Sequence, residues 1–324
     1  MIVPVFDRVC ANKISMEPEP EPEPELETLA PGLFSVATLR RCRPQPWPAG
    51  TTLLEVETLR TFESVSAEVV QLSLTIDDGS AIVVVGKGAT GSWNHGAGLR
   101  AVRRELAVFR DIAPLWACPC LRLLGVCDDG SDAGPALFLA EDLGAAGYAL
   151  VGGGVSLAQL QGAVDRLVAQ HAAFWGKLQE GLLDHANPSP SLTQSGQAWP
   201  PAVITMHAAE IRKGIAAFLA SEAGGELTDD ESALLTELLE LWEQRFLERV
   251  TGKRNVTLIH GDFHVLGNVL FRPDDPSPKV IDWSELKPGL GPHDVAYMLI
   301  SAPSDERASR DQGLLRRYWK GVST

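Results

Sequence analysis

The sequence has few cysteines and no long apolar segment. Five cysteines occur among 324 residues, and Cys118-Pro119-Cys120 has no second pair at the spacing of zinc ligands. This sparse, odd count argues against a disulfide framework and predicts free thiols in a reducing compartment. No window approaches the roughly 20 apolar residues that span a bilayer, and no basic region with a following apolar run opens the chain. We therefore expect a cytoplasmic protein without a membrane partner.

Basic residues are also too few for a general nucleic-acid binder. Lys and Arg number 28 against 42 Asp and Glu, which gives a net charge of −14. Binding along a nucleic acid needs clustered Lys and Arg, so nucleic acid is not an expected partner. Part of the negative charge is local, because residues 17–27 hold six glutamates and no basic residue. Alternating Glu and Pro favour an extended, solvated chain, so residues 1–28 are predicted to be a disordered acidic tail.

Residues 29–144 are predicted to form a strand-rich lobe with one helix. Apolar residues alternate with polar ones through Val70–Ile76, Asp77-Asp78-Gly79 is typical of a turn, and Ala81–Val85 is a compact β-branched run. Together these signals indicate a β-hairpin. The sequence also predicts two strands, at 121–126 and 137–140, and a helix at 99–109.

Residues 145–324 are predicted to form a mainly helical lobe. Two capping boxes, at 156–159 and 228–231, precede apolar residues at helical spacing. His171 lies on the first of these apolar faces, so we interpret it as a hydrogen-bonded core residue. Three short apolar runs have the length of strands and lie at 257–259, 269–271 and 280–283.

The densest polar cluster of the chain lies between two of these apolar runs. Residues 260–268 read HGDFHVLGN, and Asp282 follows a short strand in the sequence Val-Ile-Asp-Trp. An acid, an amide and a second acid are thus placed at strand ends. Phosphoryl transfer needs one carboxylate to orient the attacking hydroxyl, and an amide with a second carboxylate to hold Mg²⁺ on the phosphates.

The sequence resembles the aminoglycoside phosphotransferase and choline kinase-like small-molecule kinases, including the ecdysteroid kinase-like branch. The resemblance covers roughly residues 53–319 and is carried by HGDFHVLGN at 260–268, IDW at 281–283, DVAYML at 294–299, AAFWG at 172–176 and EDL at 141–143. It implies a bilobal α+β protein-kinase-like fold with a helical C-terminal lobe. It also implies a kinase that uses ATP and Mg²⁺ to phosphorylate a hydroxyl group of a small molecule.

The resemblance also implies roles for residues of the second lobe. Asp262 would be the catalytic base, and Asn268 and Asp282 would be the Mg²⁺ ligands. Asp294 would brace the catalytic loop, although its position before an apolar helix also fits a helix N-cap.

In the first lobe the family needs a strand lysine for the nucleotide phosphates and a helix glutamate that holds it. Lys87 follows the strand at 81–85, and Glu105 falls on the next helix beside its apolar face. Ala140, Asp142 and Leu143 would form the hinge that binds the nucleobase.

Three alternatives remain open at this point. The first is a pseudokinase of the same fold that binds nucleotide or a partner. Six positions separate Asp262 from Asn268 where the family has five, the expected phosphate-covering turn at 63–66 has no glycine, and the chain ends soon after Trp319, where relatives continue. The second is a dinucleotide-binding oxidoreductase, because Gly86–Gly91 fits G-x-G-x-x-G. The third is a two-metal phosphoesterase, because Gly-Asp-Phe-His superficially matches its pattern.

Overall fold

The computed structural model describes residues 32–64, 67–91, 96–115, 121–132, 134–152, 154–176, 201–251, 256–302 and 307–323. The acidic segment at residues 1–28, the Cys118-Pro119-Cys120 pair and the last part of the turn at 63–66 lie outside these ranges. The described residues form two compact units. The first unit extends to Val151 and includes Gly267–Leu286, and the second comprises Gly152–Leu266 and the chain from Lys287 onward. The lobe boundary placed after residue 144 stays a prediction.

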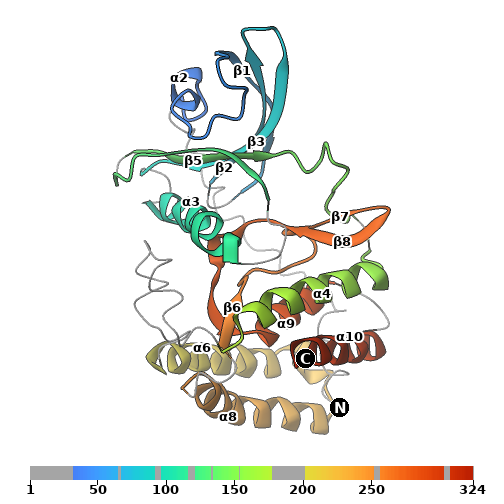
Figure 1. Cartoon of the computed structure of the whole chain (residues 1–324). Coiled ribbons are helices and arrows are strands. Elements are labelled where there is room, and N and C mark those ends of the chain that lie inside the picture. The colour runs from blue at the N-terminus through green and yellow to red at the C-terminus, as the bar shows by residue number, and fades with distance from the viewer. Residues whose placement is uncertain are drawn as a thin grey trace. The chain divides into compact units, whose positions relative to one another are not determined.

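The first unit is built on a five-stranded antiparallel sheet in the order β1-β2-β3-β5-β4 (Figure 1). Its strands are β1 (Leu53–Phe62), β2 (Glu68–Ile76), β3 (Ala81–Ala89), β4 (Leu123–Asp128) and β5 (Ala136–Glu141). The alternation in β2 buries Val70, Leu72, Leu74 and Ile76 on one face, because successive side chains of a strand point to opposite faces. The predicted hairpin of β2 and β3 is therefore confirmed, as are the strands at β4 and β5.

Strand β3 is longer than the β-branched run predicts, and the extension includes Lys87. Lys87 pairs with Val69 of β2 and with Phe138 of β5. The flanking Gly86 and Gly88 are required by close packing: a Cβ on Gly86 would lie 2.6 Å from the Phe34 ring, and one on Gly88 would lie 2.7 Å from Leu137 Cβ. These glycines, which end the strand signal in the sequence, therefore continue the strand in the fold.

One helix and one hairpin complete the part of the first unit that positions the site. Helix α3 (Ala97–Ala107) continues into a π-helical turn, η2 (Val108–Ile112), and it packs against β3, β5 and the 3₁₀ turn η5 (Trp283–Glu285). The remaining elements of this unit are α2 (Val36–Leu39), η3 (Ala113–Leu115), β7 (Val269–Arg272) and β8 (Asp275–Val280). Strand β8 ends at Val280, so Asp282 follows a strand, as predicted.

The second unit is mainly helical, as predicted (Figure 1). Its elements are α4 (Leu157–Phe174), α6 (Pro201–Leu219), α7 (Glu222–Gly225), α8 (Asp229–Thr251), β6 (Val256–Ile259), β9 (Lys287–Leu290), α9 (Pro292–Ile300) and α10 (Arg307–Val322). Both capping boxes form, with Ser156 bonded reciprocally to Gln159 and Thr228 to Glu231. Helix α4 packs against α10 and against β6, which pairs with β9. Of the helices in the described ranges, none is both long and apolar enough to cross a membrane.

Two of the five cysteines belong to the described residues, and both are free thiols as predicted. Cys42 and Cys127 are buried in the core below the five-stranded sheet. Burial raises the pKa of Cys42 to about 12. Because the thiolate is the reactive form, this cysteine is a packing residue.

Candidate active site

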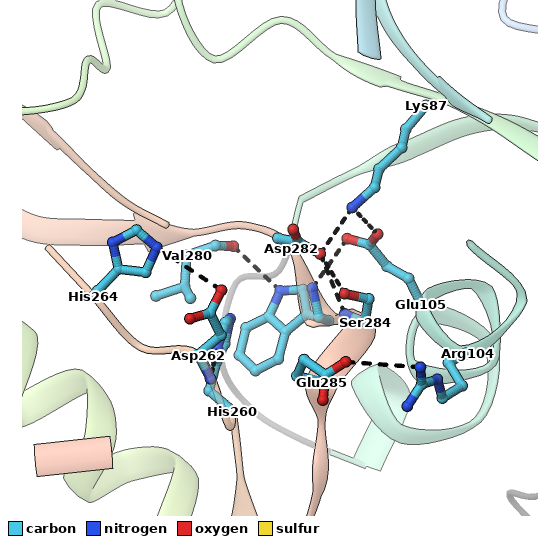
Figure 2. A network of polar contacts seen from close by, with 11 residues as sticks. Lys87, Arg104, Glu105, His260, Asp262, His264, Val280, Asp282, Ser284 and Glu285 are labelled. Carbon is cyan, nitrogen blue, oxygen red and sulfur yellow. Dashed lines mark hydrogen bonds and ion pairs between the residues drawn. The ribbon is translucent and has the colours of Figure 1, made fainter. Parts of the chain in front are cut away.

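Lys87 joins two carboxylates that come from distant parts of the sequence (Figure 2). Its Nζ lies 2.8 Å from Glu105 Oε2 and 2.8 Å from Asp282 Oδ1. Lys87 is 7% exposed and Glu105 is 1% exposed. A buried charge is tolerated only when it is paired, so the arrangement depends on all three side chains.

The positions of these residues follow from local structure. Lys87 is on a central strand of the sheet, and Glu105 lies on the face of α3 that also buries Val102 and Leu106. Residues three and four apart on a helix share a face, which is why Glu105 points inward as its spacing from Val102 predicts. The second carboxylate oxygen of Glu105 accepts a hydrogen bond from the Trp283 backbone N–H at 3.1 Å.

The charge state of Lys87 is set by its two partners. Burial by itself would lower the pKa of Lys87, but the carboxylates of Glu105 and Asp282 raise it above its usual value. Lys87 is therefore a cation at neutral pH. Burial raises the pKa of the Glu105 carboxyl, and the charge of Lys87 opposes that effect.

Asp282 has a backbone conformation that is rare for a residue with a side chain. Its φ of 58° and ψ of 70° lie in the left-handed region, which costs of the order of 1–3 kcal/mol outside glycine. Its carboxylate accepts hydrogen bonds from the Ser284 hydroxyl at 2.7 Å and the Ser284 backbone N–H at 3.4 Å. Trp283 is fully buried and its Nε1 donates to the Val280 carbonyl at 3.2 Å (Figure 2), so it anchors the turn. The Asp282 side chain remains 30% exposed.

The structure brings the backbone of Asn268 beside Asp282, its expected partner in metal binding. The Asn268 carbonyl accepts a hydrogen bond from the Ile281 N–H at 3.0 Å, so the start of β7 pairs with the end of β8 next to Asp282. An amide oxygen and a carboxylate oxygen fit Mg²⁺, which takes oxygen ligands and usually keeps waters and substrate phosphates in its remaining positions. Across the described ranges, no three His, Cys, Asp or Glu side chains gather as a metal site of their own.

The predicted hinge residues lie at the end of β5 and directly after it in the first unit. Ala140 pairs with Val85 of β3 and Leu143 is buried. The Asp142 carboxylate accepts hydrogen bonds from Gln71 Nε2 at 2.7 Å and from the Gly144 N–H at 2.8 Å. These bonds hold the side chain of Asp142 within the turn.

In the second unit, the loop that carries Asp262 is held by a buried carboxylate. Asp294 accepts hydrogen bonds from the backbone N–H groups of His260 at 2.6 Å and Gly261 at 3.0 Å. The predicted bracing role is confirmed. The alternative that Asp294 caps a helix is wrong, because the N-cap of α9 is Gly291.

A histidine and a tyrosine extend this buried network. His171 Nε2 lies 3.2 Å from Asp294 Oδ2, and His171 Nδ1 lies 2.9 Å from the Tyr318 hydroxyl. An ionised Asp294 accepts from a protonated Nε2, which leaves Nδ1 to accept from Tyr318. The prediction that His171 is a hydrogen-bonded core residue is confirmed. The sequence alone did not indicate a role for Tyr318, an aromatic residue of the last helix.

The stability of the second unit depends on the charge of Asp294. Burial would raise the pKa of Asp294, but the bonds to His171 and the Gly261 N–H, and the nearby histidines, lower it below its ordinary value. Because the folded pKa lies below the unfolded value of about 3.9, the carboxylate stabilises the folded protein above that pH. This contribution is lost as the pH falls through the folded pKa.

We therefore expect Asp294→Asn to be less stable than the wild type at pH 7 by about 1.5–3 kcal/mol, the range for hydrogen bonds to a charged group. The difference should shrink when the pH is lowered from 5 to 3. Urea unfolding of both proteins across this range measures it. A difference that is constant with pH would contradict the assigned charge of Asp294.

Asp262 itself is partly exposed and is surrounded by polar ring side chains. His264 Nε2 lies 3.8 Å from Asp262 Oδ2, and the Asp262 N–H donates to His260 Nδ1 at 3.2 Å (Figure 2). The Tyr297 side chain lies near the Asp262 carboxylate. Partial burial and the negative charge of Asp262 raise the pKa of Tyr297. The sequence analysis assigned no role to Tyr297, although this residue belongs to the DVAYML motif.

Comparison with known proteins agrees with this architecture. A family model described as "Phosphotransferase enzyme family" matches residues 92–322. Since that range is most of the chain, the protein belongs to this family. A search of curated proteins found no match.

Several solved structures are similar to this chain. A Ralstonia eutropha JMP134 protein provisionally assigned as an aminoglycoside phosphotransferase is 16% identical, with a TM-score of 0.51 over 89% of this chain and 79% of that one. An aminoglycoside-3'-phosphotransferase of type VIII is 18% identical, with a TM-score of 0.43 over 86% and 88% of the two chains. The aminoglycoside phosphotransferase APH(3'')-Id from Streptomyces rimosus is 17% identical, with a TM-score of 0.43 over 80% and 85%. The first of these comparisons supports the expected α+β protein-kinase-like fold.

Proposed function

We propose that this protein is an ATP-dependent kinase that phosphorylates a hydroxyl group of a small molecule. The observation that carries the proposal is the buried ion pair of Lys87 with Glu105, which also contacts Asp282. A lysine held at full charge by a helix carboxylate is suited to bind phosphate oxygens. The strained backbone of Asp282 supports the same conclusion, because such strain persists mainly at functional sites.

Each proposed role uses the chemistry of one side chain. Lys87, positioned by Glu105, would bind the nucleotide phosphates, and backbone groups of Ala140–Leu143 would bind the nucleobase. Asn268 and Asp282 would hold Mg²⁺, which when bound neutralises charge on the phosphates.

Asp262 would orient the acceptor hydroxyl and take its proton. Its loop is fixed by Asp294 through two backbone hydrogen bonds, which suits a reaction that depends on alignment. Phosphoryl transfer passes through a loose transition state, so most of the rate enhancement comes from positioning and charge stabilisation.

Nucleotide binding with and without Mg²⁺ tests this proposal. We expect calorimetry to show ATP binding that Mg²⁺ strengthens, and Asp282→Ala to weaken the Mg²⁺-dependent binding at least about tenfold, as loss of a charged ligand group predicts. Asp275→Ala removes a carboxylate from the start of β8 in the same unit and serves as the matched control. It should bind ATP like the wild type.

Two results would contradict the proposal. ATP binding that is indifferent to Mg²⁺ and to Asp282→Ala would favour the pseudokinase alternative. Absence of ATP binding by a protein with a cooperative thermal transition would exclude both nucleotide-dependent functions.

A further inference from the structure

One face of α9 presents ring and apolar side chains to solvent next to Asp262. His293, Tyr297 and Ile300 are spaced i, i+4 and i+7, so they share this face. All three are exposed, Tyr297 by 39% and Ile300 by 51%. The His293 and Tyr297 rings lie 6.5 Å apart between centroids at an angle of 32°. Because the buried face of α9 carries Val295 and Met298, packing of the core does not explain these exposed rings.

The loop that carries Asp262 extends this surface. The His264 ring lies 5.9 Å from the Tyr297 ring at 64°, which is an edge-to-face contact. The Val265 N–H donates to the Ser301 hydroxyl at 3.1 Å, so the loop is attached to the end of α9. Leu266, the next residue, is 48% exposed. We call the surface formed by His264, Leu266, His293, Tyr297 and Ile300 the α9 patch.

The α9 patch adjoins the predicted reacting group. His264 Nε2, which belongs to the patch, lies 3.8 Å from Asp262 Oδ2, and the His264 ring contacts the Tyr297 ring. The negative charge of Asp262 also acts on the Tyr297 hydroxyl. An acceptor bound on the patch would therefore lie beside the carboxylate that must meet its hydroxyl group.

We propose that the α9 patch is the acceptor subsite, and that it takes a hydroxylated molecule built on a flat, apolar ring system. This inference rests on the proposed kinase function, because it names the substrate class of the same site. From His293 to Ile300 the patch rises about 10 Å along the helix axis, which is long enough for an aryl glycoside or a fused-ring alcohol.

The chemistry of the patch favours compounds with rings. Aromatic faces attract other rings at centroid distances of about 4.5–7 Å, and one such contact changes affinity by roughly twofold to tenfold. Ile300 and Leu266 add apolar contact area at the far end.

Ligand-observed NMR titrations of the full-length protein without nucleotide test the proposal. The probes are 4-nitrophenyl β-D-glucopyranoside, its ring-free partner methyl β-D-glucopyranoside, and kanamycin as a polycation. We expect the aryl glucoside to bind at least about twofold to tenfold more tightly than either other probe. Tyr297→Ala should remove this preference, whereas Tyr297→Phe, which keeps the ring, should retain it.

Trp319→Ala is the matched control, because Trp319 is an aromatic residue of the same unit that is 59% exposed on α10. It should leave the ring preference unchanged. The inference is overturned if kanamycin binds most tightly, if the ring preference survives in Tyr297→Ala, or if none of the probes binds. Mg²⁺-dependent ATP hydrolysis, measured on the same samples, reports separately on the kinase function. Absence of that activity with an intact ring preference would overturn the kinase function, and the patch would then be a ring-binding surface and not an acceptor subsite.

Discussion

Asp262→Asn is expected to slow phosphoryl transfer by at least about a hundredfold while ATP binding remains. Asparagine preserves the shape of the side chain, but it cannot orient the acceptor hydroxyl as a carboxylate does or accept its proton. General base catalysis contributes about 10²- to 10⁴-fold, and we expect turnover to fall within that range. Release of ADP measured by a coupled assay gives the rate, and calorimetry gives the affinity for ATP.

The position of Asp262 makes this variant informative. Its backbone is held through the neighbouring His260 and Gly261 by Asp294, so substitution of the partly exposed side chain should leave the loop folded. Asp165→Asn is the matched control, because Asp165 is an exposed acid of the same unit that pairs with Arg317 at 2.6 Å. It should keep the wild-type rate. Wild-type turnover in Asp262→Asn would remove Asp262 from the mechanism.

Glu105→Ala is expected to produce the largest loss of stability. It leaves Lys87 buried with Asp282 as its remaining carboxylate, and it removes the acceptor for the Trp283 N–H. Breaking a buried ion pair by removing one partner costs about 3–5 kcal/mol, and the free energy of unfolding should fall by about 3 kcal/mol because Asp282 still compensates part of the charge. Urea unfolding followed by circular dichroism measures this change.

Two further variants separate the ion pair from general packing. Glu285→Ala removes an exposed carboxylate that lies 3.7 Å from Arg104, and it should change the free energy of unfolding by less than about 1 kcal/mol. The double variant Lys87→Met with Glu105→Ala removes both charges, so it should be more stable than Glu105→Ala alone. It should nevertheless bind ATP more weakly than the wild type. A double variant that is no more stable than Glu105→Ala would show that packing, and not charge, explains the loss.

Several features of the fold could be read directly from short segments of sequence. Alternating apolar residues predicted β2, and the buried face of α3 predicted the inward direction of Glu105. The capping boxes at Ser156 and Thr228 marked where two helices begin. These predictions succeeded because each depends on residues a few positions apart, whose spacing fixes which face of an element they occupy.

Other features depend on residues that meet only after folding. The sequence ended β3 at its glycines, but packing against Phe34 and Leu137 allows only glycine there and carries the strand on through Lys87. The left-handed backbone of Asp282 is held by Ser284 and Lys87, and no local pattern indicates it. The conformational preference of a single residue does not predict such contacts, because the contacts join segments far apart in the chain.

The sequence by itself determined the family resemblance, the hairpin of β2 and β3, the starts of two capped helices, and the polar segment at 260–268. Only the tertiary structure decided that Lys87, separated from Asp282 by 195 positions, forms an ion pair with it at 2.8 Å. It likewise decided that Asp294 braces its loop in place of capping a helix, and that Tyr297 lies near Asp262. The physical reason is the same in each case: spacing along the chain sets the face of an element, whereas packing of distant elements selects the partner that a charged or polar side chain meets.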